Sequence, residues 1–123
     1  MDEGLEFFEN RETDRLAKML SEEIKKSKEY EYYTKCLASL KEEPELFAEV
    51  NEVRRMNFEL QNSNSNNMSY EQYAQLSARM TNLRKNPLVS RFFNSEIGMG
   101  RLVSGIYRQI IEGIELDLDF LDD

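Results

Sequence analysis

Few side chains in this sequence could take part in chemistry, and two stand out by their positions. Glu96 falls on or beside an apolar helical repeat that includes Val89 and Phe93, where a carboxylate is costly unless it is paired. It either forms a buried ion pair with an arginine that fixes helix register, or lies at the edge of the repeat and reaches solvent. Cys36 is the single cysteine, and we interpret it as a small buried apolar residue rather than as one ligand of a cluster shared among chains.

The composition excludes most catalytic and metal chemistry. The 123 residues include no histidine and one cysteine, which rules out Ser–His or Cys–His nucleophile systems and protein-only Cys/His zinc sites. The pair Gly98-x-Gly100 follows no predicted strand and lacks the third glycine of a dinucleotide-binding loop. We therefore expect no enzyme and no cofactor, and we assign no catalytic, cofactor-binding or metal-ligating residue.

The distribution of charge bears on the class of partner. Sixteen basic and twenty-four acidic residues give a formal net charge of −8, so nucleic acid is not expected as a direct partner, nor is a membrane. Residues 51–116 are locally basic, and seven of their eight basic side chains are arginines. These arginines favour a partner of complementary charge, or they pair with the acidic residues 1–50 of the same or another copy. Because no apolar run approaches the length of a membrane span and no signal-like leader opens the chain, we expect a cytoplasmic protein.

Apolar residues recur at helical spacing through most of the chain, which predicts an all-α fold of about five helices. The expected helices cover residues 12–26, 28–42, 45–61, 70–85 and 87–116. Pro44 and Pro87 each mark a corner between helices, because proline suits the first turn of a helix and disfavours helix just before it. Ser69 and Gln72 have the spacing of a capping box at a helix start.

The last expected helix, residues 87–116, is too long for a compact monomer to cover. At 1.5 Å per residue it extends roughly 40 Å or more, whereas a domain of this size has a radius of gyration of about 14 Å. We therefore predict an elongated bundle with antiparallel helical packing, in which a second copy shares the burial of this helix. Four glycines, at 98, 100, 105 and 113, indicate either the close approach of another helix or a kink or break near Gly98–Gly100.

We expect a single helical domain over residues 1–123. Residues 1–11 form an acidic leader whose two adjacent phenylalanines are either a small docking element or an exposed patch. Residues 62–68 form a loop rich in asparagine and serine. Residues 117–123 form an acidic tail, in which apolar and acidic residues alternate as in a short binding segment or a frayed helix end.

Two segments of the chain resemble a known protein family. The first reads Leu16-Ala17-Lys18-Met19-Leu20, followed by Ile24, Ser27, Glu29-Tyr30 and Tyr33. The second reads Asn86-Pro87-Leu88-Val89, Phe92-Phe93 and Ser95-Glu96, and continues through Leu102, Ile106, Ile110 and Ile114. Together they are similar to the opening and closing segments of the YlbF/YmcA family of small helical bacterial regulators, over about residues 12–116.

The resemblance implies an all-α fold with a long C-terminal helix, self-association, and a regulatory role without catalysis. In that family the role is linked to competence, sporulation, biofilm formation and RNA processing through the endoribonuclease RNase Y. Some members bind iron–sulfur clusters through cysteines, several of them in a tail. The tail of this chain, residues 117–123, contains no cysteine, so that property is not carried over.

These observations predict a non-enzymatic cytoplasmic regulator or adaptor that associates with itself, as a homodimer or a larger assembly, and with another protein. The residues expected at the interface are Phe92, Phe93, Glu96, Met99, Leu102, Val103, Ile106 and Ile110. The residues expected at its polar rim are Arg84, Arg91 and Arg101. The alternative is an RNA-associated accessory factor that uses the arginines of residues 79–108, against which the net charge counts.

Overall fold

A computed structural model describes residues 11–62 and 69–121 of the chain. Within these residues the chain forms five α-helices and one short 3-10 helix, and no strand. The elements are α2 (Arg11–Ile24), α3 (Lys28–Lys41), α4 (Pro44–Asn62), α5 (Tyr70–Leu83), α6 (Pro87–Ile114) and η2 (Asp119–Leu121). The predicted all-α fold with a long C-terminal helix is confirmed. The predicted leader, residues 1–11, and the predicted Asn/Ser loop, residues 62–68, lie outside the described residues except for one residue each. These are Arg11, which begins α2, and Asn62, which ends α4.

The helix starts follow the local signals in the sequence. The Ser69 hydroxyl accepts a hydrogen bond from the backbone N–H of Gln72, and the Gln72 side chain accepts one from the backbone N–H of Ser69, both at 3.1 Å. The predicted capping box is therefore confirmed. The Ser27 hydroxyl accepts a hydrogen bond from the backbone N–H of Tyr30 at the start of α3, and the Asn86 side chain accepts one from that of Leu88 at the start of α6. These caps satisfy backbone donors that would otherwise have no partner in the first turn of a helix.

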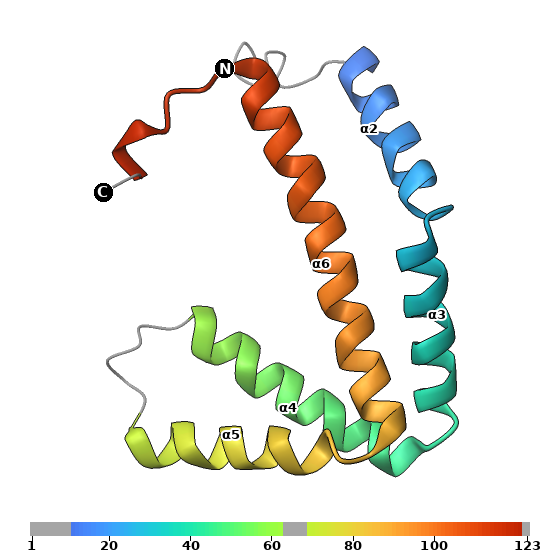
Figure 1. Ribbon diagram of the computed structural model, residues 1–123, viewed down its shortest axis with the longest axis vertical. Coiled ribbons are helices and arrows are strands. Elements are labelled where there is room, and N and C mark those ends of the chain that lie inside the picture. The colour runs from blue at the N-terminus through green and yellow to red at the C-terminus, as the bar shows by residue number, and fades with distance from the viewer. Residues whose placement is uncertain (1–10, 63–68, 122–123) are drawn as a thin grey trace, which may run out of the picture.

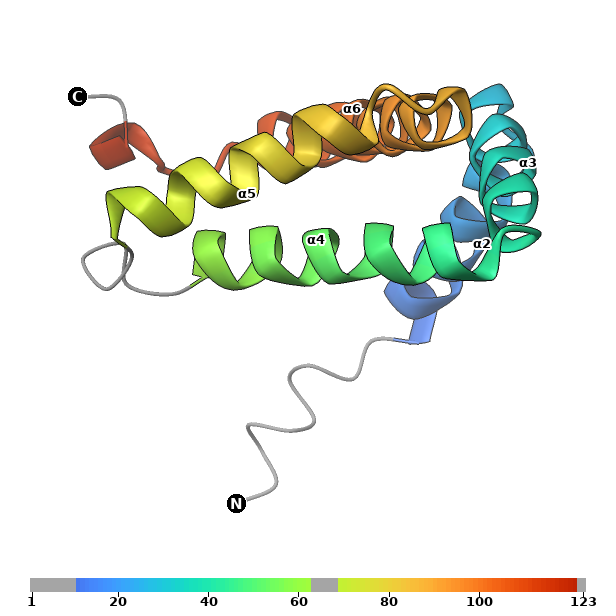
Figure 2. The ribbon, with the colours of Figure 1, turned by 90° about the horizontal axis from the view of Figure 1, so that it is seen from below.

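The helices form two arms that meet at a corner (Figure 1). In the long arm α3 runs antiparallel to α6, and α2 precedes α3 on the same side. In the short arm α4 and α5 lie antiparallel and project across the N-terminal end of α6. The extensive contacts between helices are those of α3 with α6, α4 with α5 and α3 with α4. Seen from below, α2 diverges from α6 (Figure 2).

The hydrophobic core lies at the corner where the two arms meet, and we call it the elbow core. Its buried members are Cys36, Leu40, Val50, Val53, Leu76, Leu83, Val89, Phe92 and Phe93. They come from α3, α4, α5 and the first two turns of α6, whereas α2 contributes no buried residue. Ser95 is the one buried polar residue among the described residues, and its hydroxyl donates to the Phe92 carbonyl at 2.6 Å. The placement of Cys36 agrees with its interpretation as a buried apolar residue.

The long helix α6 is continuous through its glycines. It runs for 28 residues, about 42 Å at the usual rise, and has no break at Gly98–Gly100. A Cβ atom added at any of its four glycines would meet nothing within 4 Å, so no other helix formed by the described residues approaches them closely. The helix ends at Ile114, and the backbone of the next residue, Glu115, takes the left-handed conformation with φ of 55°. This end agrees with the predicted limit near residue 116.

Candidate self-association surface

One face of α6 is apolar along its whole length, but only its first half is covered. Phe92 is completely buried in the elbow core. Ile110 lies eighteen residues further on, which is five full turns, so it points from the same side of the helix. Ile110 is nevertheless 49% exposed. The exposed part of this face consists of Val103, Tyr107, Ile110 and Ile114, which we call the open stripe.

The open stripe results from where the covering helices end. The helix α3 runs beside the first half of α6, whereas the helix next to the second half is α2, which diverges from it (Figure 2). The side chains of the open stripe are between 49% and 62% exposed. A contiguous apolar patch of this kind on a polar chain is typical of surfaces through which proteins associate. It therefore forms the first part of the candidate surface.

A second apolar surface lies on α2 and consists of Leu16, Met19 and Leu20, which we call the α2 face. Leu16 and Met19 are each 51% exposed, and Leu20 is 37% exposed. The spacing of three and four residues places them on one side of the helix. The α2 face and the open stripe therefore leave the long arm with uncovered apolar surface on two neighbouring helices.

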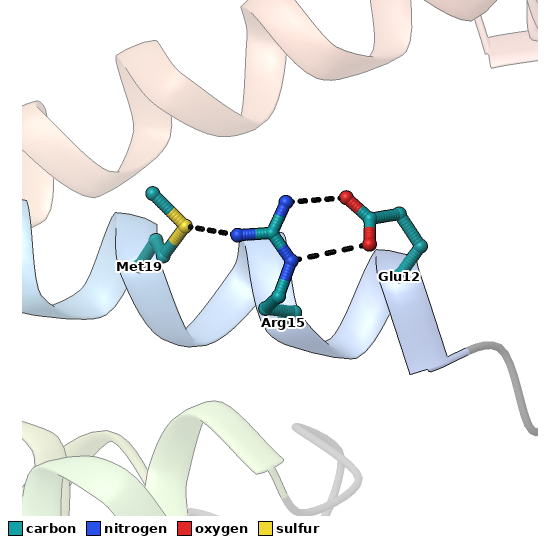
Figure 3. Close-up of polar contacts among 3 residues, drawn as sticks. All are labelled: Glu12, Arg15 and Met19. Carbon is teal, nitrogen blue, oxygen red and sulfur yellow. Dashed lines mark hydrogen bonds and ion pairs between the residues drawn. The ribbon is translucent and has the colours of Figure 1, made fainter.

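The α2 face is bordered by a polar network that runs along the helix (Figure 3). The Arg15 guanidinium forms an ion pair with Glu12 and donates a hydrogen bond from Nη1 to the Met19 sulfur at 3.1 Å. The hydrogen bond from Arg15 lowers the pKa of the Glu12 carboxyl. Because both charged groups are well exposed, the pair contributes little to stability. These contacts hold the Arg15 side chain along the surface of α2, next to Met19.

The structure shows that the eight predicted interface residues differ in burial. Phe92 and Phe93 lie inside the elbow core, where they pack against other parts of the same chain. Met99, Leu102 and Ile106 are half-buried. Val103 and Ile110 are exposed and belong to the open stripe. Glu96 is half-buried between the core and the stripe.

The prediction of the interface residues omitted two members of the open stripe and the whole α2 face. Tyr107 and Ile114 continue the spacing of Val103 and Ile110 by three and four, so the helical repeat of α6 already contained the signal for them. The strongly amphipathic sequence of α2 was also visible. Its exposure was not, because an amphipathic helix is normally covered by the rest of the chain.

Glu96 forms an ion pair across the corner of the molecule. Its Oε2 lies 2.8 Å from Nη2 of Arg54 on α4, and both side chains are about one third exposed, at 32% and 35%. The Arg54 guanidinium also lies over the Phe92 ring, 5.0 Å from its centroid. Glu96 therefore takes part in an ion pair and also reaches solvent, and its arginine comes from the same chain. The pair joins α4 to α6 at the edge of the elbow core.

The remaining arginines differ in their surroundings. Arg79 forms an ion pair with Glu52 at 3.3 Å, and its hydrogen bond to that carboxyl lowers the pKa of Glu52. Arg84 lies over the Phe93 ring at 4.9 Å, on the short-arm side of the corner. Arg91 and Arg101 are exposed on α6. The three predicted rim residues therefore differ in burial and in neighbours.

The single cysteine lies inside the elbow core. The Cys36 thiol is buried, and its hydrogen bond with Tyr32 raises the pKa of the tyrosine hydroxyl. Within residues 11–62 and 69–121, no three carboxylate, thiol or imidazole side chains come together as ligands for a metal ion. None of the helices in these ranges combines the length and the apolar character needed to cross a membrane.

Comparison with known proteins agrees with the resemblance described above. Residues 14–115 match the family described as control of competence regulator ComK, YlbF/YmcA. The matched range includes nearly all of α2 and the whole of α3 to α6, so it covers both arms, the elbow core and the open stripe. No curated protein and no solved structure matches the chain. From the extent of the family match, the chain belongs to the YlbF/YmcA family of regulators.

Proposed function

We propose that this chain is a cytoplasmic regulator that acts by association rather than by catalysis. Two copies bury their open stripes and α2 faces against each other, and the resulting assembly binds another protein. The observation that carries this proposal is the open stripe, an apolar helix face that the chain covers over one half of α6 and leaves exposed over the other. Membership of a family of regulators supports the proposed regulatory role.

The size of the exposed surface is compatible with a stable pair. Full burial of a large apolar side chain contributes about 1.5–3 kcal/mol, so burying the exposed half of one contributes about 1 kcal/mol. The four side chains of the open stripe then contribute about 8 kcal/mol for two copies, which falls within the cost of association of about 4–15 kcal/mol. The stripes alone therefore give a marginal pair, and burial of the α2 faces makes the assembly stable.

Light scattering coupled to size-exclusion chromatography tests the proposal. We expect the full chain at about 100 µM, well above a micromolar dissociation constant, to have at least twice the single-chain mass of 14.6 kDa. Tyr107→Ser, in the open stripe, is expected to shift the mass towards that of one chain. Tyr70→Ser is the matched control, because Tyr70 is 87% exposed on the short arm, away from the stripe. A wild-type chain that stays single at this concentration contradicts the proposal.

The family description supports control of competence as the process in which the regulator acts. Links to sporulation, biofilm formation and RNase Y remain predictions from the resemblance. We do not propose direct RNA binding, because the net charge of the chain is −8 and Arg79 is engaged with Glu52. A gel shift with structured and single-stranded RNA at several salt concentrations tests for direct RNA binding. Binding through phosphate contacts would weaken steeply as the salt concentration rises.

A further inference from the structure

A groove of about 530 Å³ lies between α4, the end of α5 and the first half of α6. Its apolar lining includes Phe58 and Ile97, which are 65% and 45% exposed. Its charged lining consists of Arg54, Arg55, Arg84 and Glu96. The groove is therefore both apolar and basic, on a chain whose net charge is −8. This combination is distinct from the open stripe, which carries no charged residue.

Two of the three arginines in the groove are available to a ligand. Arg54 is paired with Glu96, so these two charges compensate each other. Across the described residues, no carboxylate lies within ion-pair distance of Arg55 or Arg84. Arginine binds carboxylates through two parallel hydrogen bonds, and apolar neighbours strengthen such contacts by excluding water. The groove is thus suited to a segment that alternates acidic and apolar residues.

The chain itself contains a segment with this chemistry. From Leu116 onward the residues alternate between leucine or phenylalanine and aspartate, and no basic residue occurs in the rest of the chain. Phe120 and Leu121 are 72% and 66% exposed, so their apolar side chains have little cover in the single chain. Asp117 and Asp119 supply carboxylates beside them. The acidic tail and the groove are therefore complementary in charge and in apolar surface.

Residues Leu116–Phe120 are too few to reach Ile97, on the α6 side of the groove, within the same chain. Ile97 precedes Glu115 by eighteen residues on α6, a separation of about 27 Å along the helix. The five residues from Glu115 to Phe120 extend over at most about 17 Å. We therefore infer that the groove between α4, α5 and α6 binds the acidic tail, residues Leu116–Leu121, of a second copy of the chain.

The inference rests on the proposed self-association and specifies how two copies are oriented. If the open stripes pair antiparallel about a two-fold axis through their centre, Ile114 of one copy lies opposite Val103 of the other. From that point Ile97 is six residues further along the second helix, or about 9 Å. The six residues Leu116–Leu121 span up to about 20 Å when extended, which is enough to enter the groove. Each tail therefore continues the contact that the open stripes begin.

Disulfide cross-linking between two differently substituted full-length chains tests the inference. One chain carries Phe120→Cys in the tail, and the other carries Phe58→Cys in the groove. The matched control replaces the groove variant by Tyr70→Cys, which places an exposed cysteine on α5 outside the groove. All chains keep Cys36, which is buried. We expect the tail to cross-link to the groove at least about tenfold faster than to the control position, because docking raises the effective concentration.

Charge reversal shows whether the arginine contributes. Arg55→Glu in the groove copy is expected to slow the cross-link about fivefold, because an attraction becomes a repulsion. Arg55 is exposed and makes no ion pair, so this change leaves the elbow core intact. Asp119→Arg in the tail copy should restore the rate with the Arg55→Glu groove and slow it with the wild-type groove. Equal rates with the groove and control cysteines, or insensitivity to both charge changes, would overturn the inference.

The two proposals fail in different ways. If light scattering shows an assembly that is sensitive to Tyr107→Ser while the tail cross-links no faster to the groove than to the control, the tail inference is wrong and the proposed function stands. If the chain stays single and the tail cross-links selectively, the groove binds the tail without pairing of the open stripes. If neither signal appears, both are wrong.

Discussion

Two alanine substitutions on the same side of α6 should have opposite consequences. Phe92→Ala removes a completely buried ring from the elbow core, whereas Ile110→Ala shortens a side chain five turns away that is 49% exposed. The sequence presents both positions as members of one apolar face. We expect Phe92→Ala to destabilise each chain and Ile110→Ala to weaken the assembly.

The expected magnitudes follow from burial. Truncating a buried phenylalanine to alanine costs about 3–5 kcal/mol, and Phe92 lies between the Tyr33 ring at 5.8 Å and the Arg54 guanidinium at 5.0 Å, which suggests the middle of that range. A chain of this length has a total stability of roughly 6–18 kcal/mol. Phe92→Ala therefore removes a large share of it. Ile110→Ala should cost about 1 kcal/mol or less in the single chain, because half of its surface already faces water.

Urea unfolding and light scattering separate the two effects. At a concentration where light scattering reports single chains, Phe92→Ala should lower the urea midpoint by about 2 M and Ile110→Ala by less than about 0.5 M. At a concentration where the wild type is assembled, loss of about 1 kcal/mol per copy should raise the dissociation constant of an Ile110→Ala pair about 30-fold. An Ile110→Ala chain as unstable as Phe92→Ala would show that the second half of α6 is covered within the chain, contrary to the structure.

Three further predictions concern single features of the fold. Gly100→Ala should raise the free energy of unfolding by about 1 kcal/mol, because the added Cβ meets nothing within 4 Å and alanine favours the helix. A loss of assembly in light scattering would instead show that a second copy approaches Gly100 closely. A double-mutant cycle of Arg54→Gln and Glu96→Gln should give a coupling of about 0.5–1 kcal/mol in urea unfolding, and no coupling would show that the partly exposed pair does not stabilise the corner. The folded-state pKa of Glu52 is lowered by its arginine partner, so its stabilising contribution is present above the unfolded-state pKa and is lost as the pH falls through the folded-state pKa. Between about pH 5 and pH 3, wild-type stability should therefore fall more steeply than that of Glu52→Gln, and parallel pH profiles would contradict this.

Local features of the fold could be predicted from the sequence because they depend on neighbouring residues. The capping box of Ser69 and Gln72 involves residues three apart, and the start of α6 at Pro87 follows from the conformation that proline prefers. The continuity of α6 through its glycines could not be decided in this way. Each glycine weakens a helix by about 1 kcal/mol, which alone does not break one that packs along its side.

The candidate surface shows the limit of such reasoning. Helical spacing placed Phe92 and Ile110 on one face of α6, and it did so correctly, since a repeat of three and four residues is a local property. The spacing is the same whether or not another helix covers that face. For this reason the predicted interface mixed core residues such as Phe93 with exposed ones such as Val103.

The sequence by itself determined the family, the all-helical composition and the helix boundaries to within two residues. The tertiary structure decided which half of α6 is covered, because that depends on where α3 ends and on the course of α2 away from α6. It also decided that Glu96 finds its arginine on α4, 42 residues earlier in the chain. Contacts between residues so far apart depend on the angles between helices, which only the packing of the elbow core sets.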